Sequence, residues 1–532
     1  MRLRDPRRLP LNLLSTPGDV LTLDIGPVAH GGHCVARIGS GPNAGRVVFV
    51  RHALPGEKVR ARITEHGKVW RADALEVLEN LSPYRVPSAW PEAGPGGVGG
   101  GELSHVSPEG QRRWKAAVIA EQITRLAKID ISRISPTLAI DPKTFELTEL
   151  DSQRGLRDPA TPVGAAAPTS AQDDGGGVGA GAPTSAQDDG GGVGAGAPTS
   201  AQDDGGEVCG ALGVESLSGG ATGTRTRVEL VTNEQGQAGM TKHRSGEIIP
   251  LKSMPLATPE LGEFLENKGV WRGGWPANAR LTAVVPAGSK AADGILLVNQ
   301  DRNSTPAPMD TKFIKEIVQL DDKSYEYQVA ADGFWQVHEK APAWLIENVL
   351  KAANLKSGQK VLDLYAGSGL FTVPLAEAVG TAGQVIAIEG DKKAAENAKT
   401  NTAQFSQVEV IQADVRKALA KPSTRTTANN SASKNRKATP ATNLGANQNS
   451  INTEKTDVVI LDPPRVGAGQ QVVTQIAARN PERVVYVACD PAALARDIAY
   501  FQAANYHLTD LKAADLFPNT HHVECVAVLT RD

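Results

Sequence analysis

The stretch VLDLYAGSG, residues 361–369, decides the fold of this chain. It is an apolar run that ends in a glycine-rich turn, and four later runs have a similar form: QVIAIEG (384–390), VEVIQAD (408–414), DVVILDPP (457–464) and VVYVACDP (484–491). Helical patterns separate most of these runs, which is the alternation of a doubly wound parallel sheet. HLTDLKAADLF (507–517) and VECVAVLTRD (523–532) predict two more strands, the last as part of an antiparallel hairpin edge. We therefore predict an α/β domain over 336–532 with a Rossmann-like, mostly parallel sheet.

Residues 15–82 predict a small all-β unit. Five short strand-like runs are separated by Gly, Pro and Asn: VLTLDIG (20–26), HCVARIG (33–39), RVVFVRHAL (46–54), EKVRARIT (57–64) and RADALEVLE (71–79). This spacing suggests an OB-like barrel, a fold often used on single-stranded nucleic acid. A β-cap that only stabilises the chain is the alternative, and periodicity does not decide between the two.

A second β-rich unit is predicted between the barrel and the α/β domain. It comprises 83–154, with a helix over 108–128, and 223–335, where TRVELVTN (226–233) and ARLTAVVPA (279–287) are among several strand-like runs. We assign both segments to one central domain.

Two segments hold too little apolar surface to form a core. Residues 155–222 contain APTSAQDDGGGVGAG repeated with a period of 15, and Pro168, Pro183 and Pro198 mark the register. Residues 421–456 are rich in Asn, Thr, Ser and Lys. We predict that both are disordered inserts, the second within the α/β domain.

The net charge of −3 understates the basic character of the rest of the chain. Residues 165–207 carry seven acidic residues and no Lys or Arg, a charge of −7, so the remaining residues carry +4. This balance is compatible with an RNA partner and does not identify one.

The sequence shows no sorting or membrane signal. The basic stretch 1–14 is interrupted by Pro6 and Pro10 and no apolar segment follows it. No run approaches the roughly 18–20 apolar residues of a membrane span. The four cysteines are scattered without a CxxC pair, so neither a disulfide framework nor a four-cysteine metal site is expected. We predict a cytoplasmic chain without membrane association or a stable protein partner.

Polar residues close three successive strands of the α/β domain. Gly367 lies in the turn after the first strand, where a ligand can approach the backbone and a helix N-terminus favours negative charge. Glu389 ends the second strand, where an acid suits ribose hydroxyls, and Asp414 ends the third, where a carboxylate can accept from an adenine amino group. A strand-end acid is often only a helix cap. Three such positions in order predict a cofactor that contains adenosine.

Three residues further along could carry covalent chemistry. Asp462 precedes a stiff Pro-Pro pair at the ligand edge of the sheet, and Cys489 ends the next strand at the same edge. A lone cysteine is more often a buried apolar residue, but this position favours a nucleophile, which would need activation. Glu524 is a candidate base. The adjacent His521 and His522 lack the spacing of a helical metal-ligand pair, so we predict no metal site.

These residues closely resemble those of the RNA uracil-5 methyltransferases, a class I S-adenosylmethionine-dependent family that forms 5-methyluridine in tRNA and ribosomal RNA. The resemblance runs from about Phe334 to the C-terminus and rests on these motifs: FWQVH, DLYAGSGLF, IEGD, LDPPRVGAG, ACDPAALARD and FPNTHHVE. The first β unit resembles a TRAM domain, the RNA-binding module that precedes many of these enzymes.

The resemblance implies a role for each site residue. Cys489 would add to uracil C6 and Glu524 would remove the C5 proton. Asp462 and Gln336 would hold the uracil edge and also contact S-adenosylmethionine. The remaining contacts to this cofactor would come from Tyr365, Gly367, Glu389 and Asp414. The target would be an unstacked uridine in RNA, with ribosomal RNA favoured by the TRAM unit and tRNA as the alternative.

Many TRAM-bearing relatives carry four cysteines for a [4Fe–4S] cluster, and this chain departs from that pattern. The corresponding stretch from Arg85 to Glu102 contains no Cys, and the later position is Met254. The resemblance therefore implies that no iron–sulfur cluster is present.

Two other functions compete with this interpretation. One is a non-catalytic RNA-binding protein, which would have no need of all three reactive residues, and the other is methylation of cytosine C5 or of an amine. Arg465 stands where amine methyltransferases usually carry an aromatic residue, and the FPxTxHxE ending is foreign to the cytosine-5 enzymes.

Overall fold

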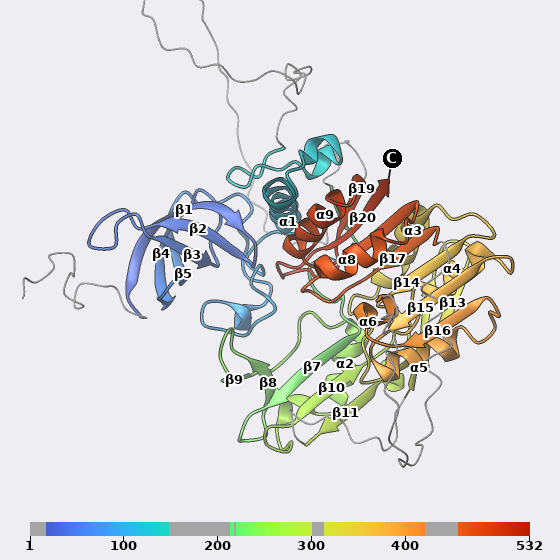
Figure 1. Cartoon of the computed structure of the whole chain (residues 1–532). Coiled ribbons are helices and arrows are strands. Elements are labelled where there is room, and N and C mark those ends of the chain that lie inside the picture. The colour runs from blue at the N-terminus through green and yellow to red at the C-terminus, as the bar shows by residue number, and fades with distance from the viewer. Residues whose placement is uncertain (1–17, 148–212, 218–219, 301–312, 421–455, 532) are drawn as a thin grey trace, which may run out of the picture. The chain divides into compact units, whose positions relative to one another are not determined.

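The computed structural model describes residues 18–147, 213–217, 220–300, 313–420 and 456–531 (Figure 1). These residues belong to one compact unit by their contacts. The predicted repeat segment lies outside the described residues, as does 421–455. Within the described residues, no helix combines the length and apolar character needed to span a membrane.

The first strands form a closed barrel in the order β1-β2-β3-β5-β4. Their bounds are β1 (Val20–Ala29), β2 (His33–Arg37), β3 (Val47–Arg51), β4 (Lys58–Glu65) and β5 (Trp70–Glu79). In β4 the apolar residues alternate with exposed polar ones, so Val59, Ala61 and Ile63 face the barrel core. The antiparallel pairing of β1 with β4 closes the barrel. The OB-like barrel predicted from the sequence is confirmed.

A five-stranded antiparallel sheet follows, in the order β11-β10-β7-β8-β9. Its strands are β7 (Arg227–Thr232), β8 (Ala238–Thr241), β9 (Ile248–Pro250), β10 (Arg280–Val284) and β11 (Ile295–Asn299). Helix α2 (Pro259–Asn267) begins at Thr258, whose hydroxyl accepts from the Leu261 amide, and buries Phe264 and Leu265 in the core of this sheet.

Two elements expected in the central domain pack elsewhere. Helix α1 (Pro108–Gln122) contacts α9 (Pro491–Gln502) of the α/β domain and strand β6 (Val214–Ser216). Strands β12 (Phe313–Gln319) and β13 (Ser324–Ala330) form a separate hairpin. The inward residues of this hairpin join the core beneath the helices of the α/β domain. The expected domain boundary at 335 therefore falls after a hairpin that packs with the catalytic sheet. The sequence did not reveal this, because the alternating pattern of a strand does not specify which core the strand joins.

The α/β domain contains an eight-stranded sheet in the order β16-β15-β14-β17-β18-β20-β19-β6. Its first five members are parallel to one another: β14 (Lys360–Leu364), β15 (Gln384–Glu389), β16 (Val408–Gln412), β17 (Val458–Leu461) and β18 (Arg483–Ala488). Strands β19 (Tyr506–Asp515) and β20 (Glu524–Arg531) form an antiparallel hairpin. The Rossmann-like, mostly parallel sheet is confirmed.

The far end of this sheet differs from the prediction in two respects. Strand β20, expected at the edge, lies between β18 and β19 and is antiparallel to both. Strand β6 pairs in parallel with β19, although its residues were assigned to the disordered insert 155–222. Its Val214 is buried, and the indole of Trp344 donates to Glu215 at 2.7 Å. Three residues are too few to give a periodic signal, so the sequence did not distinguish β6 from the segment before it.

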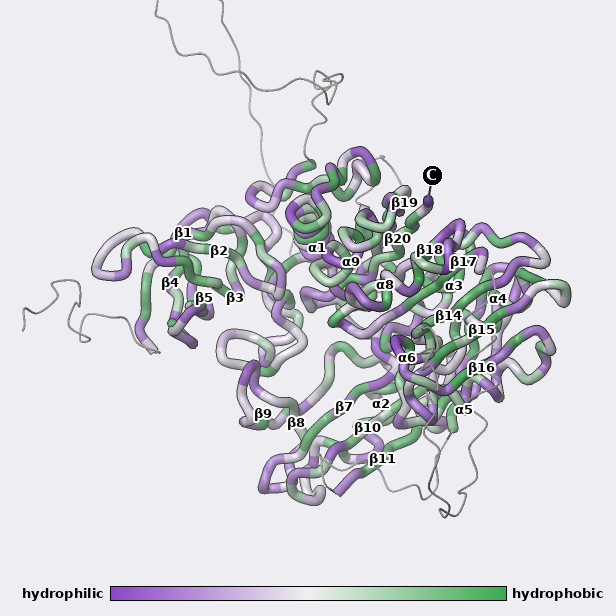
Figure 2. The backbone as a smooth tube through the Cα atoms, viewed as in Figure 1, coloured by the Kyte–Doolittle hydropathy of each residue, from purple (hydrophilic) through white to green (hydrophobic). Residues whose placement is uncertain are grey.

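Helices cover both faces of the sheet, and alternate residues of each strand point to opposite faces. Val361, Val385 and Ile460 pack beneath α3 (Ala341–Ala353) and α4 (Thr372–Val379). Leu362, Ile386 and Leu461 belong to the core of the other face, with residues from α6 (Val415–Leu419), α8 (Gly469–Ala477) and α9. Helix α5 (Lys392–Asn401) contacts β15 and β16. The hydrophobic colour of the parallel strands in Figure 2 reflects this burial on two sides.

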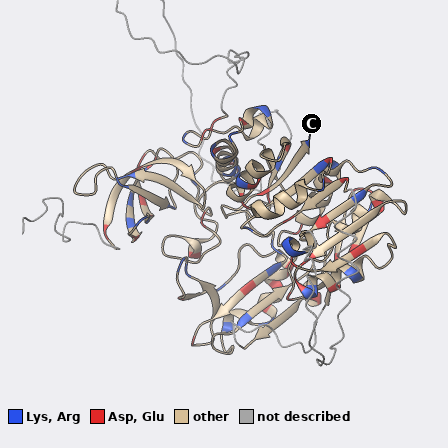
Figure 3. Ribbon diagram, in the orientation of Figure 1, with Lys and Arg blue, Asp and Glu red and all other residues tan. Residues whose placement is uncertain are grey.

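Charged residues are mixed along the elements. Lys and Arg lie among Asp and Glu over the described residues in Figure 3. The charge distribution of these elements therefore does not by itself identify a nucleic-acid surface.

Candidate functional site

A cavity of about 1490 Å³ opens where the parallel strands β14, β15, β17 and β18 end. All eight residues singled out from the sequence line it: Gln336, Tyr365, Gly367, Glu389, Asp414, Asp462, Cys489 and Glu524. They come from separate strand ends and, for Gln336, from the segment before α3. The carboxyl ends of parallel strands meet at one edge of the sheet, which is why residues so far apart in the chain converge here.

The turn after β14 is shaped for close approach of a ligand to the backbone. Tyr365 has a φ of 62° and Gly367 a φ of 56°, both in the left-handed region. The Tyr365 amide donates to the Ile388 carbonyl at 2.9 Å, which ties the turn to β15. A tyrosine rarely adopts this conformation, so the neighbouring structure must hold it there.

Glu389 and Asp414 occupy the ends of two adjacent parallel strands. Glu389 accepts from the Gly367 amide at 2.8 Å and from the Asp391 amide at 2.7 Å, so it fixes the glycine turn. Asp414 caps α6, since it accepts from the Lys417 amide at 3.0 Å, and it remains exposed. Capping and ligand binding are compatible here, because each carboxylate has further lone pairs.

Two buried acids lie deeper in the site. Burial, together with the charge of Glu389, raises the pKa of Asp363 to about 7, against the opposing effect of the Thr372 hydroxyl that donates to it. Burial raises the pKa of Asp462 to about 7 as well, with added repulsion from Asp363 and Glu389. At neutral pH these two carboxyl groups therefore populate both the protonated and the ionised form.

Cys489 and Glu524 are brought together by the antiparallel pairing of β18 with β20. The register pairs Ala488 with Cys525, so the next residue on each strand, Cys489 and Glu524, lies at the same end of the pair. Burial, with smaller contributions from the nearby Glu524 and Asp462, raises the pKa of the Cys489 thiol to about 12, and Arg465 opposes the rise. Burial and the charge of Asp462 also hold the pKa of Glu524 well above its ordinary value.

The cavity has further walls that were not assigned roles from the sequence. Phe334, whose side chain is 72% exposed, Phe517 and His522 line it, as does Arg465. Three of them fall within the motifs FWQVH and FPNTHHVE quoted for the resemblance. An exposed aromatic residue beside a cavity offers a face on which a base can stack.

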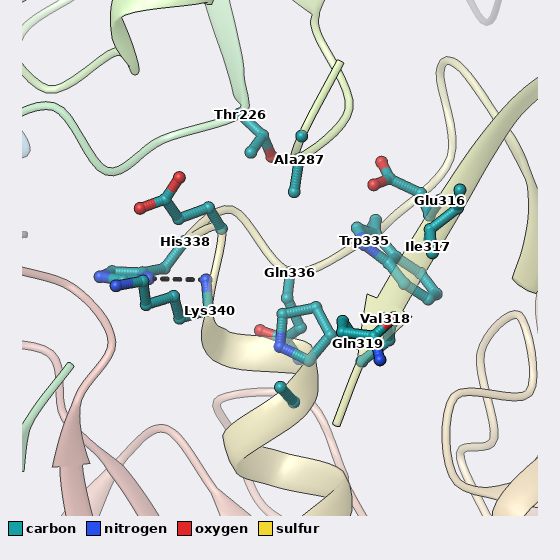
Figure 4. Close-up of a pocket in the computed structure, with 14 residues that line it drawn as sticks. Thr226, Ala287, Glu316, Ile317, Val318, Gln319, Trp335, Gln336, His338 and Lys340 are labelled. Atoms are coloured by element: carbon teal, nitrogen blue, oxygen red, sulfur yellow. Dashed lines mark hydrogen bonds between the residues drawn. The ribbon is translucent and has the colours of Figure 1, made fainter. Parts of the chain in front are cut away.

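A second cavity of about 440 Å³ lies behind the segment that carries Gln336 (Figure 4). Trp335 and Gln336 line both cavities, and Trp335 lies toward strand β12 in this view. The Lys340 amide donates to His338 Nδ1 at 3.1 Å. The second cavity contains neither Cys489 nor Glu524, so only the larger one combines the candidate reactive groups.

The walls of the larger cavity fit an adenosine-containing sulfonium cofactor. Glu389 and Asp414 present carboxylate oxygens suited to hydroxyl and amino donors, and Tyr365, at the end of the preceding parallel strand, adds an aromatic ring to the same cavity. Their negative charge also suits a cation such as a sulfonium. Asp363 Oδ1 is buried without a hydrogen-bond partner in the described residues, which leaves an acceptor beneath the glycine turn.

The structure shows no metal centre in its described residues. In that part of the chain, no group of three or more His, Cys, Asp or Glu side chains is placed to hold an ion. Trp90, in the stretch from Arg85 to Glu102, and Met254 are buried in one hydrophobic cluster. The absence of an iron–sulfur cluster stays a prediction, which iron analysis of the purified protein would test.

Comparison with known proteins places this chain among RNA-modifying enzymes. It matches the family described as tRNA (Uracil-5-)-methyltransferase over residues 294–532 and the TRAM domain over residues 14–68. A Streptomyces coelicolor protein described as an uncharacterized RNA methyltransferase is 34% identical, and the alignment covers 97% of this chain and 94% of that one. A Bifidobacterium longum protein with the same description is 32% identical, with 94% of each chain covered.

A solved structure shares the fold over nearly the whole chain. It is the Pyrococcus abyssi tRNA (uracil-54, C5)-methyltransferase in complex with S-adenosyl-L-homocysteine, with a TM-score of 0.53. The match covers 95% of this chain and 100% of that one at 18% identity. At 18% identity this similarity supports the assignment of the fold alone.

Proposed function

Because the chain belongs to the tRNA (uracil-5-)-methyltransferase family and carries a TRAM domain, we propose that it forms 5-methyluridine in RNA by covalent catalysis at Cys489. It is an S-adenosylmethionine-dependent RNA methyltransferase. The observation that carries the covalent mechanism is the pairing of β18 with β20, which sets Cys489 beside Glu524 in a cavity that also contains Asp462.

Uracil C5 is too weak a nucleophile to be methylated directly, and the proposed role of Cys489 is to activate it. The thiolate forms a bond to C6, and the ring electrons move to make C5 an enolate carbon. S-adenosylmethionine, when bound, supplies an electrophilic methyl group to that carbon. Glu524 then removes the C5 proton, and the C6–S bond breaks to return the thiolate and the 5-methyluridine.

The protonation states of the buried acids suit these steps. The raised pKa of Glu524 makes its ionised form a stronger base than an ordinary glutamate, which favours removal of a carbon-bound proton. Asp462, with a pKa of about 7, can accept from the uracil N3–H when ionised or donate to a ring carbonyl when protonated. The amide of Gln336, in the segment before α3, offers both a hydrogen-bond donor and an acceptor to the uracil edge.

We assign the cofactor contacts to the glycine turn and the two strand-end acids. Gly367 allows close backbone approach, Glu389 holds that turn and accepts from ribose hydroxyls, and Asp414 accepts from the adenine amino group. Tyr365, Gln336 and Asp462 complete the pocket toward the uridine. These assignments rest on the position of each residue in one cavity.

We propose ribosomal RNA as the substrate, because the barrel adds an RNA-binding module to the catalytic domain. The alternative is tRNA, which the description of the matched family and the Pyrococcus abyssi protein both name. In either case the uridine must be unstacked so that Cys489 and the methyl donor reach opposite faces. Such substrates would place the enzyme in the cytoplasm.

Methyl transfer from labelled S-adenosylmethionine tests this proposal. Total unmodified RNA would be incubated with the protein, separated into tRNA and ribosomal RNA, and digested to nucleosides. We expect labelled 5-methyluridine, mainly in the ribosomal fraction. Label in 5-methylcytidine, or none in any nucleoside, would overturn the reaction, and label confined to tRNA would overturn the substrate.

A pair of variants tests the two catalytic roles separately. Cys489→Ala should abolish both turnover and covalent protein–RNA adducts, since no sulfur remains to bond C6. Glu524→Gln should also stop turnover but should accumulate adducts that survive denaturation, because the C5 proton stays in place and elimination stalls. Retained turnover in the Ala variant would contradict the nucleophile. Wild-type protein that binds RNA but forms neither product nor adduct would favour the alternative of a non-catalytic RNA-binding protein.

A further inference from the structure

A residue of the barrel contacts the residue that follows the nucleophile. His30 lies in the turn between β1 and β2, and its Nε2 lies 2.9 Å from Asp490 Oδ2. Asp490 is bonded to Cys489 in the chain and caps α9, since its other oxygen accepts from the Ala493 amide at 2.8 Å. Both side chains are half-buried or more, with exposed fractions of 34% and 20%.

The same turn also contacts the loop that leads to Glu524. The rings of His30 and His521 meet edge to face, with centroids 6.2 Å apart. A Cβ atom at Gly32 would lie 2.8 Å from the Glu102 side chain and 3.3 Å from that of His521, so the turn is closely packed. Glu102 in turn accepts from the His521 amide at 3.0 Å. One turn of the barrel is therefore packed against both loops that present the candidate catalytic residues.

The charge on Asp490 matters because Cys489 is already surrounded by acids. Glu524, Asp462 and Asp490 each raise the pKa of the thiol, and Arg465 opposes them. Of the three acids, Asp490 has an imidazole, that of His30, in direct contact, and this ring is a cation when protonated. We infer that His30 is a positioning residue for the nucleophile: as an imidazolium it fixes Asp490 and balances that carboxylate beside Cys489, so that the barrel contributes to thiolate formation. The inference rests on the proposed role of Cys489.

The pairing depends on pH in a defined direction. The hydrogen bond to Asp490 raises the pKa of His30, burial opposes this, and Glu121 of α1 adds to the rise while the nearby Arg125 opposes it. The neighbouring His521 ring is itself paired with Glu102. The charged pair is therefore complete below the ordinary pKa of histidine and is lost as pH rises through the higher folded value.

Covalent adduct formation measures the effect. Total RNA from bacteria grown with 5-fluorouracil would be mixed with S-adenosylmethionine and excess protein, and denaturation-resistant adducts would be timed. At C5 a fluorine in place of hydrogen prevents the final proton removal, so the adduct persists. His30→Gln keeps a hydrogen-bond donor but removes the charge. We expect about a tenfold slower adduct formation near pH 6.5, the effect of one pKa unit on the thiol.

Two further comparisons separate charge from general damage. The ratio of wild-type to His30→Gln rates should fall toward one as pH rises, since wild-type loses the same charge. Asp490→Asn keeps a capping side chain, so His30→Gln should have little effect when added to it. His66→Gln, an exposed barrel histidine remote from this contact, should match wild-type.

The outcomes are distinct. The role of His30 would be overturned by equal rates for wild-type and His30→Gln, or by a ratio of these rates that does not change with pH. It would also be overturned if His30→Gln slowed the reaction as much in the Asp490→Asn background as in the wild-type. If wild-type itself forms no adduct with this RNA while Cys489→Ala behaves identically, the proposed function fails and the inference fails with it.

Discussion

Cys489 lies in surroundings that oppose its ionisation in the free protein. Burial and the carboxylates Glu524 and Asp462 raise the pKa of its thiol to about 12, and Arg465 only partly offsets them. At neutral pH such a thiol is mainly protonated, which slows its oxidation and alkylation. The proposed covalent step therefore requires that the thiol lose its proton once the substrate is bound.

Alkylation of the free protein should report this protonation. The rate of carbamidomethylation at Cys489 by iodoacetamide should rise about tenfold per pH unit from pH 7 to 9 with no plateau, since the thiolate fraction rises by that factor below the pKa. Peptide mass spectrometry would follow this residue separately from the buried Cys34 and Cys525.

The neighbouring charges supply matched controls for this measurement. Glu524→Gln should speed alkylation at a given pH, because a negative neighbour is lost, and Arg465→Gln should slow it. A plateau below pH 8 in the wild-type protein would show that the thiol is more acidic than its surroundings indicate.

At this scale the sequence predicted which residues converge on one cavity, and it missed the contacts that support them. All eight selected residues line one cavity, because strand-end positions in a parallel sheet can be read from apolar runs and turns. Their individual roles stay predictions. His30 was missed, since its contact with Asp490 joins residues 460 positions apart and follows from tertiary packing, which leaves no local pattern.

Helix α1 holds the loop between β19 and β20 from outside the sheet. Lys115, fully buried, forms an ion pair with Asp515 and donates to the Phe517 carbonyl at 3.1 Å. Gln111 accepts from the Asn519 amide at 2.6 Å and donates to its side chain at 3.1 Å. These contacts fix the loop that precedes Glu524.

Removing the buried cation should destabilise the protein strongly. Lys115→Met leaves Asp515 charged and buried without its partner, so we expect a loss of about 3–5 kcal/mol in the free energy of unfolding, measured in urea. Adding Asp515→Asn should recover part of this loss. Lys58→Met, which breaks the more exposed pair with Glu79, should cost less than about 1 kcal/mol. Equal losses for the two single variants would contradict the role of burial.

Strand β6 defines where the repeat insert can be removed. Deletion of residues 165–207 should leave methyl transfer and the midpoint of thermal unfolding nearly unchanged, since the described core does not include them. Deletion of 165–217 also removes β6 and the bond between Trp344 and Glu215, so it should lower that midpoint. A large loss of activity on the shorter deletion would show that the repeats have a function.

The elements themselves could be predicted where a pattern is long enough. The barrel strands and the parallel strands carry clear alternation or apolar runs, and they were placed correctly. The hairpin β12–β13 falls within the segment 223–335 that is predicted to be β-rich. Which core it joins depends on the packing of Tyr325 and Tyr327, which belong to the core of the α/β domain. Such a choice is made by packing and is not encoded in the period of a strand.

The molecule as a whole buries several neutral histidines. Burial is the largest cause in each case: it lowers the pKa of His33 and His105 to about 3, that of His338 to about 4, and that of His52 well below its ordinary value. These groups bind protons in the unfolded chain at a pH where the folded protein does not. Their contribution to stability is therefore present above the unfolded pKa of about 6.5 and is lost as pH falls below it.

The protein should consequently lose stability in mild acid. Each such histidine should lower the free energy of unfolding by about 1.4 kcal/mol per pH unit between pH 6 and 4, measured by urea titration at several pH values. His105→Gln should reduce the slope by that amount. His30 acts in the opposite sense because its pKa is raised, so His30→Gln should not reduce the slope. A stability that is flat from pH 7 to 5 would contradict this account.

The acidic lining of the catalytic cavity has a consequence for how RNA is admitted. Phosphate groups would be repelled by the carboxylates of Glu389 and Asp414, whereas an uncharged base would not. The backbone of the RNA is therefore kept at the rim, where it exchanges condensed counterions for basic side chains, and the base alone passes inward. Added salt should weaken the capture of RNA through this exchange, while the covalent steps inside the cavity, shielded from the surrounding electrolyte, proceed at a rate that ionic strength changes little.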